Sequence, residues 1–139
     1  MQSSNNKKVL VSGASFAGLS TAWWMNQLGY QVTVVEVANE LKKSGTPVNI
    51  RENTVDIVKR MGLFEQIKAK RLNLELWEFK NANDVTESSM LLRQEGEPLP
   101  DDDFEIERDV LLNMMFDLVK MMLNSFFNHY TLMPTFVVY

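Results

Sequence analysis

Gly13, Ser15 and Gly18 have the spacing of the three glycines in a G-x-G-x-x-G turn. In that motif the first glycine makes a tight turn, the second lets the backbone approach a pyrophosphate, and the third lets a helix pack closely on a strand. The N–H groups that begin the helix then favour an anion. Ser15 replaces the middle glycine, which weakens the site without removing it, because serine is small and its hydroxyl could donate. The spacing predicts a site for the pyrophosphate of a dinucleotide.

Glu36 follows Gly18 at about the 20-residue spacing of the acidic residue that accepts a hydrogen bond from a ribose hydroxyl in such sites. A carboxylate suits a free 2′-hydroxyl and repels a 2′-phosphate, so Glu36 favours FAD or NAD over NADP. These residues do not separate FAD from NAD. The alternative is a tight turn that binds no ligand, with Glu36 as an exposed strand end.

Three elements must position these residues. Residues 9–11 and 31–36 are β-branched runs, which predict buried strands. Residues 17–28 have helical spacing of apolar side chains and are followed by Gly29, a typical C-terminal cap. A strand, a glycine turn, a helix and a strand within about 30 residues predict a βαβ unit with a parallel strand pair.

The rest of the chain is predicted to form short helices and strands joined by polar loops. The expected helices are 54–61 (capped by Asn53), 63–70 and 109–120 (capped by Asp109). The expected extended segments are 48–50, 72–79, 85–86 with 90–93 across a turn at Asn83 and Asp84, and 104–108. Residues 94–103 are acidic and contain prolines, which predicts a solvated loop.

The composition excludes several classes of protein. The chain has 139 residues, 45% of them hydrophobic and 23% charged, which predicts one folded domain. The net charge of −4 argues against a nucleic-acid partner. The absence of cysteine excludes a disulfide framework and a thiolate site, and the single histidine, His129, excludes a multi-histidine metal site. No metal is expected.

The two ends of the chain carry no membrane or export signal. Residues 1–6 are polar and lack the charged and apolar regions of a signal peptide. Residues 121–139 have no charged side chain, but their asparagine, serine, threonine and proline residues make them a poor membrane span. We expect a cytoplasmic protein without a membrane partner.

Three segments resemble a known family. VLVSGASFAGLSTAWWMNQLGYQVTVVE, SGTPVNIRENTVDIVKRMGL and EIERDVLLNMMF follow one another in the order found in FAD-dependent monooxygenases of the aromatic-hydroxylase type. That family includes para-hydroxybenzoate hydroxylase and the tetracycline-inactivating flavin monooxygenases. The resemblance covers about residues 7–120. It implies an α/β protein with a Rossmann-like βαβ FAD-binding fold, incomplete, with a few additional strands and helices.

The resemblance also implies roles for individual residues. Glu36 would hold the adenosine ribose, Lys43 would lie near the adenine side, and Arg51, at the end of segment 45–51, would approach the isoalloxazine or the substrate. Arg108 would contact the diphosphate and ribityl region. The residues that would line the FAD pyrophosphate are Gly13, Ser15, Phe16, Ala17 and Gly18. The alternative for Lys43, Arg51 and Arg108 is an ordinary solvated charge.

The family's activity implies the chemistry. NAD(P)H reduces FAD, and oxygen activated on the flavin is transferred to an electron-rich small molecule, usually aromatic; the protein binds, orients and excludes water. No residue can be named as a catalytic acid or base. The other hypotheses are a non-catalytic nucleotide-binding module and a nonfunctional truncation product.

The end of the sequence departs from the family. Family members run to several hundred residues, and an Asp-Gly segment and a Gly-Asp segment that they carry later in the chain are absent. We therefore expect residues 1–120 to be the N-terminal part of an FAD-binding domain and residues 121–139 to be an atypical tail, which could be out of frame. The alternative is a genuine closing helix and edge strand. The apolar tail and an unpaired sheet edge could lead to self-association.

Overall fold

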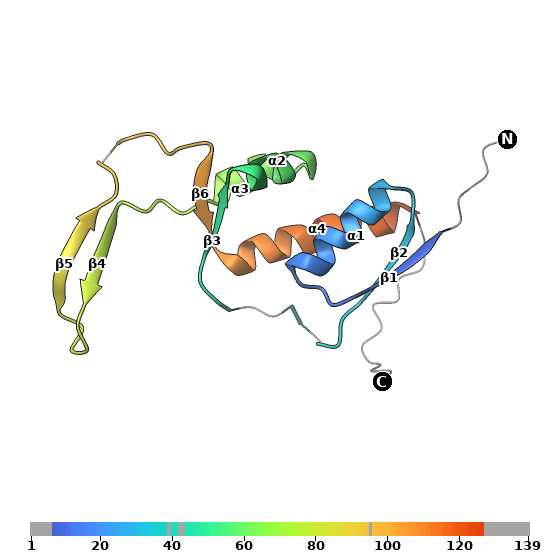
Figure 1. Cartoon of the computed structure of the whole chain (residues 1–139), viewed down its shortest axis with the longest axis horizontal. Helices are drawn as coiled ribbons and strands as arrows, with labels where there is room; N and C mark the ends of the chain where they lie inside the picture. Colours follow the sequence, from blue (N-terminus) through green and yellow to red (C-terminus); the bar gives the residue numbers. More distant parts are fainter. Residues whose placement is uncertain (1–6, 39, 42–43, 95, 127–139) are drawn as a thin grey trace.

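The computed structural model describes residues 7–38, 40–41, 44–94 and 96–126, and within these it contains four helices and six strands (Figure 1). The strands are β1 Lys8–Ser12, β2 Gln31–Val35, β3 Val48–Arg51, β4 Leu76–Lys80, β5 Thr86–Leu91 and β6 Asp103–Ile106. The helices are α1 Phe16–Gln27, α2 Asn53–Arg60, α3 Phe64–Lys70 and α4 Arg108–Phe126.

β1, α1 and β2 form the predicted βαβ unit. β1 and β2 are parallel, with Val9 opposite Val32 and Val11 opposite Val34. The N–H of Gln31 donates to the carbonyl of Lys7 at 2.8 Å, which continues the pairing beyond β1. The α/β fold class is confirmed.

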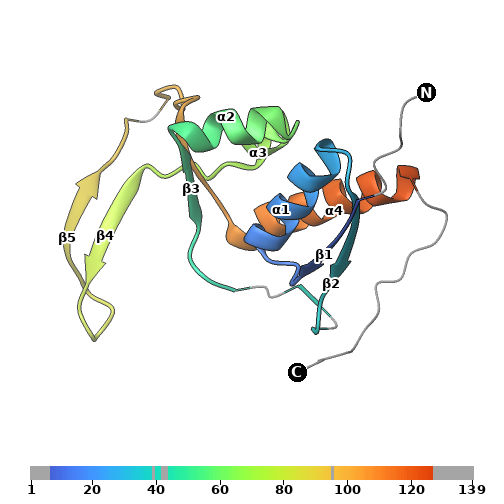
Figure 2. The ribbon, with the colours of Figure 1, turned by 45° about the vertical axis from the view of Figure 1, so that its right-hand side comes forward.

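β3 and β6 form an antiparallel pair that the sequence patterns did not predict. Ile50 lies opposite Phe104, and both side chains are buried. The pair brings residues 48–51 beside residues 103–106 and leads directly into α4, which passes alongside α1 (Figure 2). This connection delivers the start of α4 to the region of the glycine turn.

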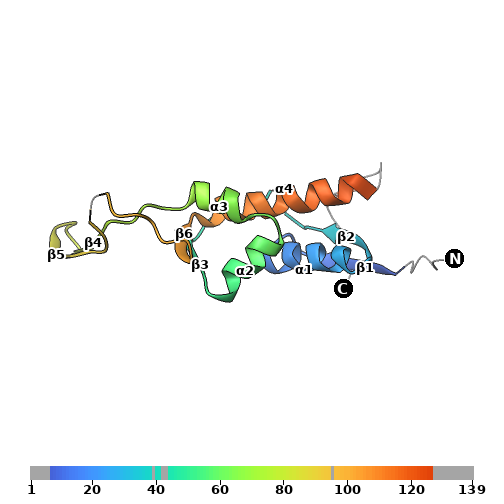
Figure 3. The same ribbon diagram turned by 90° about the horizontal axis from the view of Figure 1, so that it is seen from above.

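The core lies between α1, α4 and the strand pairs β1–β2 and β3–β6. Leu19 and Ala22 of α1 are buried, as are Leu111 and Met115 of α4. Ile67 of α3 is fully buried in the same cluster. In the view from above, β3 and β6 lie between the helices and the β4–β5 hairpin (Figure 3). Along α4 the methionines differ in burial: Met115 lies in the core, whereas Met121 is 66% exposed.

β4 and β5 form an antiparallel hairpin that extends away from the rest of the fold (Figure 1). All residues of both strands are exposed. Asn81 Oδ1 accepts hydrogen bonds from the N–H groups of Asn83 and Val85, which closes the predicted turn. The strand starts at Leu76 rather than at residue 72, because the N–H of Leu72 donates to Glu105 of β6 instead.

Two predicted helix caps are wrong. α2 begins at Asn53 itself, and the capping position is Glu52, whose side chain makes no cap hydrogen bond. α4 begins at Arg108, one residue before the predicted cap Asp109, and continues to Phe126 instead of ending at Lys120. No helix among the described residues combines the length and the apolar character that crossing a membrane requires.

Candidate cofactor-binding site

The turn between β1 and α1 is held against the end of β2. Gly13 has a φ of 97°, a conformation that favours glycine, and its N–H donates to the carbonyl of Val35 at 2.7 Å. Gly18 faces back toward this residue, and a Cβ built on Gly18 would overlap the carbonyl oxygen of Gly13. Gly13 therefore supplies the backbone conformation of the turn, and Gly18 allows its close packing.

Ser15 caps α1. Its backbone is extended, and its Oγ accepts a hydrogen bond from the N–H of Gly18 at 3.3 Å. The residue that replaces the middle glycine thus stabilises the start of the helix. Among the described residues, the N–H groups of Phe16 and Ala17 have no acceptor, so the start of α1 keeps free donors for an anion.

Glu36 lies directly after β2 and reaches back to the turn. Its Oε2 accepts from the N–H of Ala14 at 2.7 Å, and its Oε1 accepts from the N–H of Ala38 at 2.9 Å. These donors, Ala38 first and then Ala14, hold the pKa of the Glu36 carboxyl below its ordinary value. The side chain is an ionised acceptor beside the glycine turn.

Arg108, the first residue of α4, approaches the turn from the other side. Its guanidinium carbon lies 4.9 Å from the centroid of the Phe16 ring, a cation–π contact. Gly45 has a φ of 122°, and a Cβ there would lie 2.9 Å from Cδ of Arg108. Gly45 therefore leaves the space that the arginine side chain occupies.

These groups surround a cavity of about 540 Å³. The cavity has free N–H donors and a guanidinium for phosphates, and a carboxylate for a ribose hydroxyl, so the residues fit the diphosphate and ribose of FAD. Its lining residues are Ala14, Ser15, Phe16, Glu36, Ala38, Ser44, Gly45, Thr46, Arg108 and Leu112. Ser44 and Thr46 were not predicted individually; their position beside Gly45 in the polar segment SGT is the signal that could have indicated them.

The structure brings most of the predicted site residues to this one place. Gly13, Ala17 and Gly18 build the turn, while Ser15, Phe16, Glu36 and Arg108 face the cavity. Arg51, the last residue of β3, lines a different cavity, and Lys43 lies outside the described residues.

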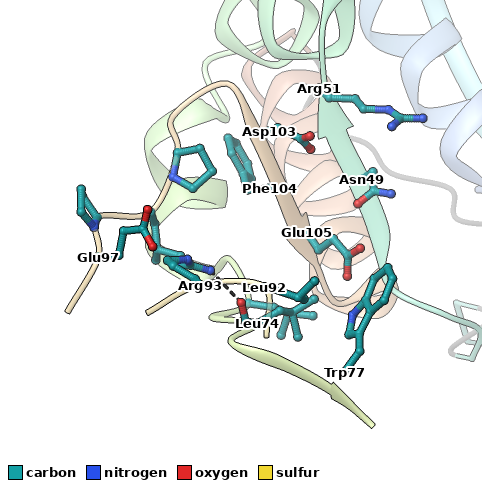
Figure 4. Close-up of a pocket in the computed structure, with 14 residues that line it drawn as sticks. Asn49, Arg51, Leu74, Trp77, Leu92, Arg93, Glu97, Asp103, Phe104 and Glu105 are labelled. Atoms are coloured by element: carbon teal, nitrogen blue, oxygen red, sulfur yellow. Dashed lines mark hydrogen bonds between the residues drawn. The ribbon is translucent and has the colours of Figure 1, made fainter. Parts of the chain in front are cut away.

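The second cavity, of about 550 Å³, lies between the base of the hairpin and the β3–β6 pair (Figure 4). Trp77 and Phe104 contribute aromatic surface, and Arg51 and Arg93 also line this cavity. Arg93 donates to the carbonyl of Leu74 at 2.8 Å and to Asn73 at 3.0 Å, so it is engaged in holding the hairpin base. In the part of the chain that the structure describes, no group of acidic or histidine side chains could hold a metal ion.

A parallel βαβ unit, its glycine turn and an acid after the second strand together define a dinucleotide-binding domain of the Rossmann type. The chain belongs to the FAD binding domain family, whose model matches residues 6–123.

Curated relatives support this membership. A flavin-dependent monooxygenase from an unknown prokaryotic organism is 30% identical over 118 residues, covering 83% of this chain and 30% of the relative. The putative FAD-dependent monooxygenase YetM of Bacillus subtilis is 29% identical over 113 residues, covering 81% of this chain and 29% of the relative. The chain thus spans about 30% of the length of the relatives it matches.

Solved structures of other proteins share the fold of this chain. The tetracycline destructase Tet(51) has a TM-score of 0.69 at 29% identity, covering 82% of this chain and 28% of that chain. The 2-methyl-3-hydroxypyridine-5-carboxylic acid oxygenase has a TM-score of 0.61 at 19% identity, a likeness of fold alone, which covers 85% of this chain and 30% of the other.

Proposed function

We propose that this chain is the FAD-binding part of a monooxygenase that uses NAD(P)H and O2 to hydroxylate a small aromatic substrate. The observation that carries the proposal is the single cavity that has the start of α1, Glu36 and Arg108 on its walls. When bound, FAD supplies electron transfer from the nicotinamide and oxygen transfer to the substrate. The protein's own residues bind and orient it.

Each end of the cavity suits a different part of FAD. The N–H groups of Phe16 and Ala17 would donate to the diphosphate, assisted by the charge of Arg108. The carboxylate of Glu36 has lone pairs beyond the two that accept from Ala14 and Ala38, and these would accept from the adenosine ribose. Lys43 would lie near the adenine.

Arg51 has a separate proposed role. It lines the second cavity together with Trp77 and Phe104, so it would lie toward the isoalloxazine or the substrate rather than the diphosphate. An arginine beside aromatic surface suits a planar, electron-rich molecule that carries an acidic group.

The division of the chain remains a proposal as well. Residues 1–120 would form the N-terminal part of the FAD-binding domain, and residues 121–139 would be a distinct tail. The family match extends to residue 123 and α4 continues to Phe126, and both observations favour a boundary a few residues after 120. Resequencing across codon 120 tests the out-of-frame hypothesis, which is contradicted if no neighbouring frame continues open. The cytoplasmic location expected from the sequence stays a prediction.

Self-association is proposed through apolar surface that the described residues leave uncovered. Leu10 of β1 is 66% exposed, and within these residues β1 pairs only with β2. The hairpin exposes Trp77 and Phe79. An unpaired strand edge with apolar side chains is a surface on which a second copy can pair.

The proposal is tested by titrating FAD into the purified chain and following the quenching of flavin fluorescence. Glu36→Arg should abolish saturable binding, because it places a cation where the ribose acceptor stands. Asp117→Arg, an identical charge change at an exposed position of α4, should retain it. A folded chain that binds no FAD, or a Glu36→Arg variant that binds as well as the unsubstituted chain, contradicts the assignment.

A second measurement separates a redox protein from a non-catalytic nucleotide-binding module. The FAD-loaded chain is mixed anaerobically with NADH or NADPH, and the flavin absorbance is followed. Loss of absorbance supports redox function within this chain. If the flavin absorbance stays unchanged with both NADH and NADPH, this chain binds the cofactor without carrying out its reduction.

A further inference from the structure

We propose that Phe16 is a positioning residue that holds the Arg108 guanidinium ready for the diphosphate of FAD. This inference rests on the proposed function and adds the residue that places the arginine. Phe16 is the first residue of α1, and Arg108 is the first residue of α4. The two helix starts meet through the contact of 4.9 Å between guanidinium and ring.

The position of Arg108 is electrostatically unfavourable without a partner anion. A cation at the start of a helix opposes the helix dipole. Arg108 has no carboxylate partner and no hydrogen bond among the described residues, although Glu107 and Asp109 flank it in sequence. The charge is therefore available to a ligand. The side chain contacts the Phe16 ring, and it passes beside Gly45, which has no Cβ to displace it.

The contact with Phe16 leaves the N–H donors of the guanidinium available to a ligand. Arg108 Cζ lies over the Phe16 ring, and among the described residues no N–H group of the guanidinium donates to a protein acceptor. Those donors can make paired hydrogen bonds to phosphate oxygens. Phe16 and Arg108 line the same cavity, and Phe16 belongs to the helix start that keeps free N–H groups, so an anion bound there could reach both kinds of donor.

The stack itself is tested without any ligand. In the NMR spectrum of the chain, the side-chain Nε–H proton of Arg108 should be shifted upfield by the ring current of Phe16. The shift should disappear in Phe16→Leu, which keeps apolar volume without an aromatic ring, and persist in Phe16→Tyr. An Arg108 proton at its ordinary position in the unsubstituted chain overturns the proposal.

The role toward the diphosphate is tested by a double-mutant cycle on FAD affinity. Phe16→Leu should weaken FAD binding roughly 3- to 10-fold when Arg108 is present, as a cation–π contact of ordinary strength implies. In an Arg108→Gln background the same change should have almost no effect, because there is no guanidinium left to position. Phe16→Tyr, which keeps an aromatic ring, should recover most of the affinity that Phe16→Leu loses, and circular dichroism melts check that every variant is folded.

The outcomes separate this inference from the proposed function. Equal losses in both backgrounds mean that Phe16 acts only as a structural residue, which overturns the inference while FAD binding stands. Absence of FAD binding by the folded, unsubstituted chain overturns the proposed function and the diphosphate role together, while the ring-current shift still decides whether Phe16 holds Arg108.

Discussion

The Glu36 carboxylate accepts a hydrogen bond from the backbone N–H of Ala14 at 2.7 Å, so a side chain at the end of β2 is joined to the glycine turn that follows β1. The same carboxylate accepts from Ala38, and Gly13 donates to Val35 within the same region. The acid expected to bind a ribose therefore also stabilises the turn that faces the diphosphate. Changes at Glu36 should affect both folding stability and cofactor binding.

Glu36→Gln should remove a pH-dependent part of the stability. The pKa of Glu36 is held below its ordinary value of 4.5 by the N–H groups of Ala38 and Ala14. The carboxylate therefore stabilises the fold fully above about pH 4.5, and this contribution is lost as the pH falls through the lower, folded-state pKa. Melting temperatures of the two chains should differ most at neutral pH and converge in acid. A difference that stays constant with pH contradicts this origin.

Gly18→Ala should destabilise the chain although alanine is ordinarily the better helix former. A Cβ at residue 18 would overlap the carbonyl oxygen of Gly13, and such overpacking costs about 1–3 kcal/mol. Thr21→Ala, at an exposed position of the same helix, should instead be neutral or slightly stabilising. The free energies of unfolding from urea titrations decide this, and a stabilised Gly18→Ala variant would show that the turn is not packed this closely.

Gly45→Ala should reduce FAD affinity in addition to the loss of stability that its φ of 122° implies for alanine. Its Cβ would lie 2.9 Å from Cδ of Arg108, and the arginine would have to move away from the cavity. Loss of a charge-assisted hydrogen bond to phosphate implies binding weakened roughly 10-fold or more. Gly29→Ala is the matched control, because Gly29 has a φ of 83° and open space where a Cβ would lie. It should lower the melting temperature of the chain and leave FAD affinity unchanged.

Phe79→Glu should reduce self-association of the purified chain. Trp77 and Phe79 lie on one face of the hairpin because side chains alternate along a strand, and they are 46% and 53% exposed. Placing a charge on that face should shift sedimentation velocity profiles toward the monomer. Asn83→Asp adds the same charge at the hairpin turn and should leave the profile unchanged. Equal association of both variants would contradict a contact through the hairpin and would indicate another surface, such as the edge of β1.

Much of the fold was predictable because its signals are local. The β-branched runs, the glycine spacing and Gly29 predict β1, α1 and β2 within a residue or two of their observed limits. The hairpin is also local, since Asn83 and Asp84 lie in the turn between β4 and β5. The caps of α2 and α4 were mispredicted because both helices begin directly after β3 or β6, and the strand pairing sets their first residues.

Local sequence signals were enough to predict the βαβ unit, the turn at Gly13 and Gly18, and the place of Glu36 at the end of β2. These depend on residue types and spacings within a short stretch of chain. The contact between Arg108 and Phe16, and the position of Arg51 beside a different cavity, depend on the packing of distant segments. Those relationships follow from the antiparallel pairing of β3 with β6, a contact between distant segments that no local periodicity encodes.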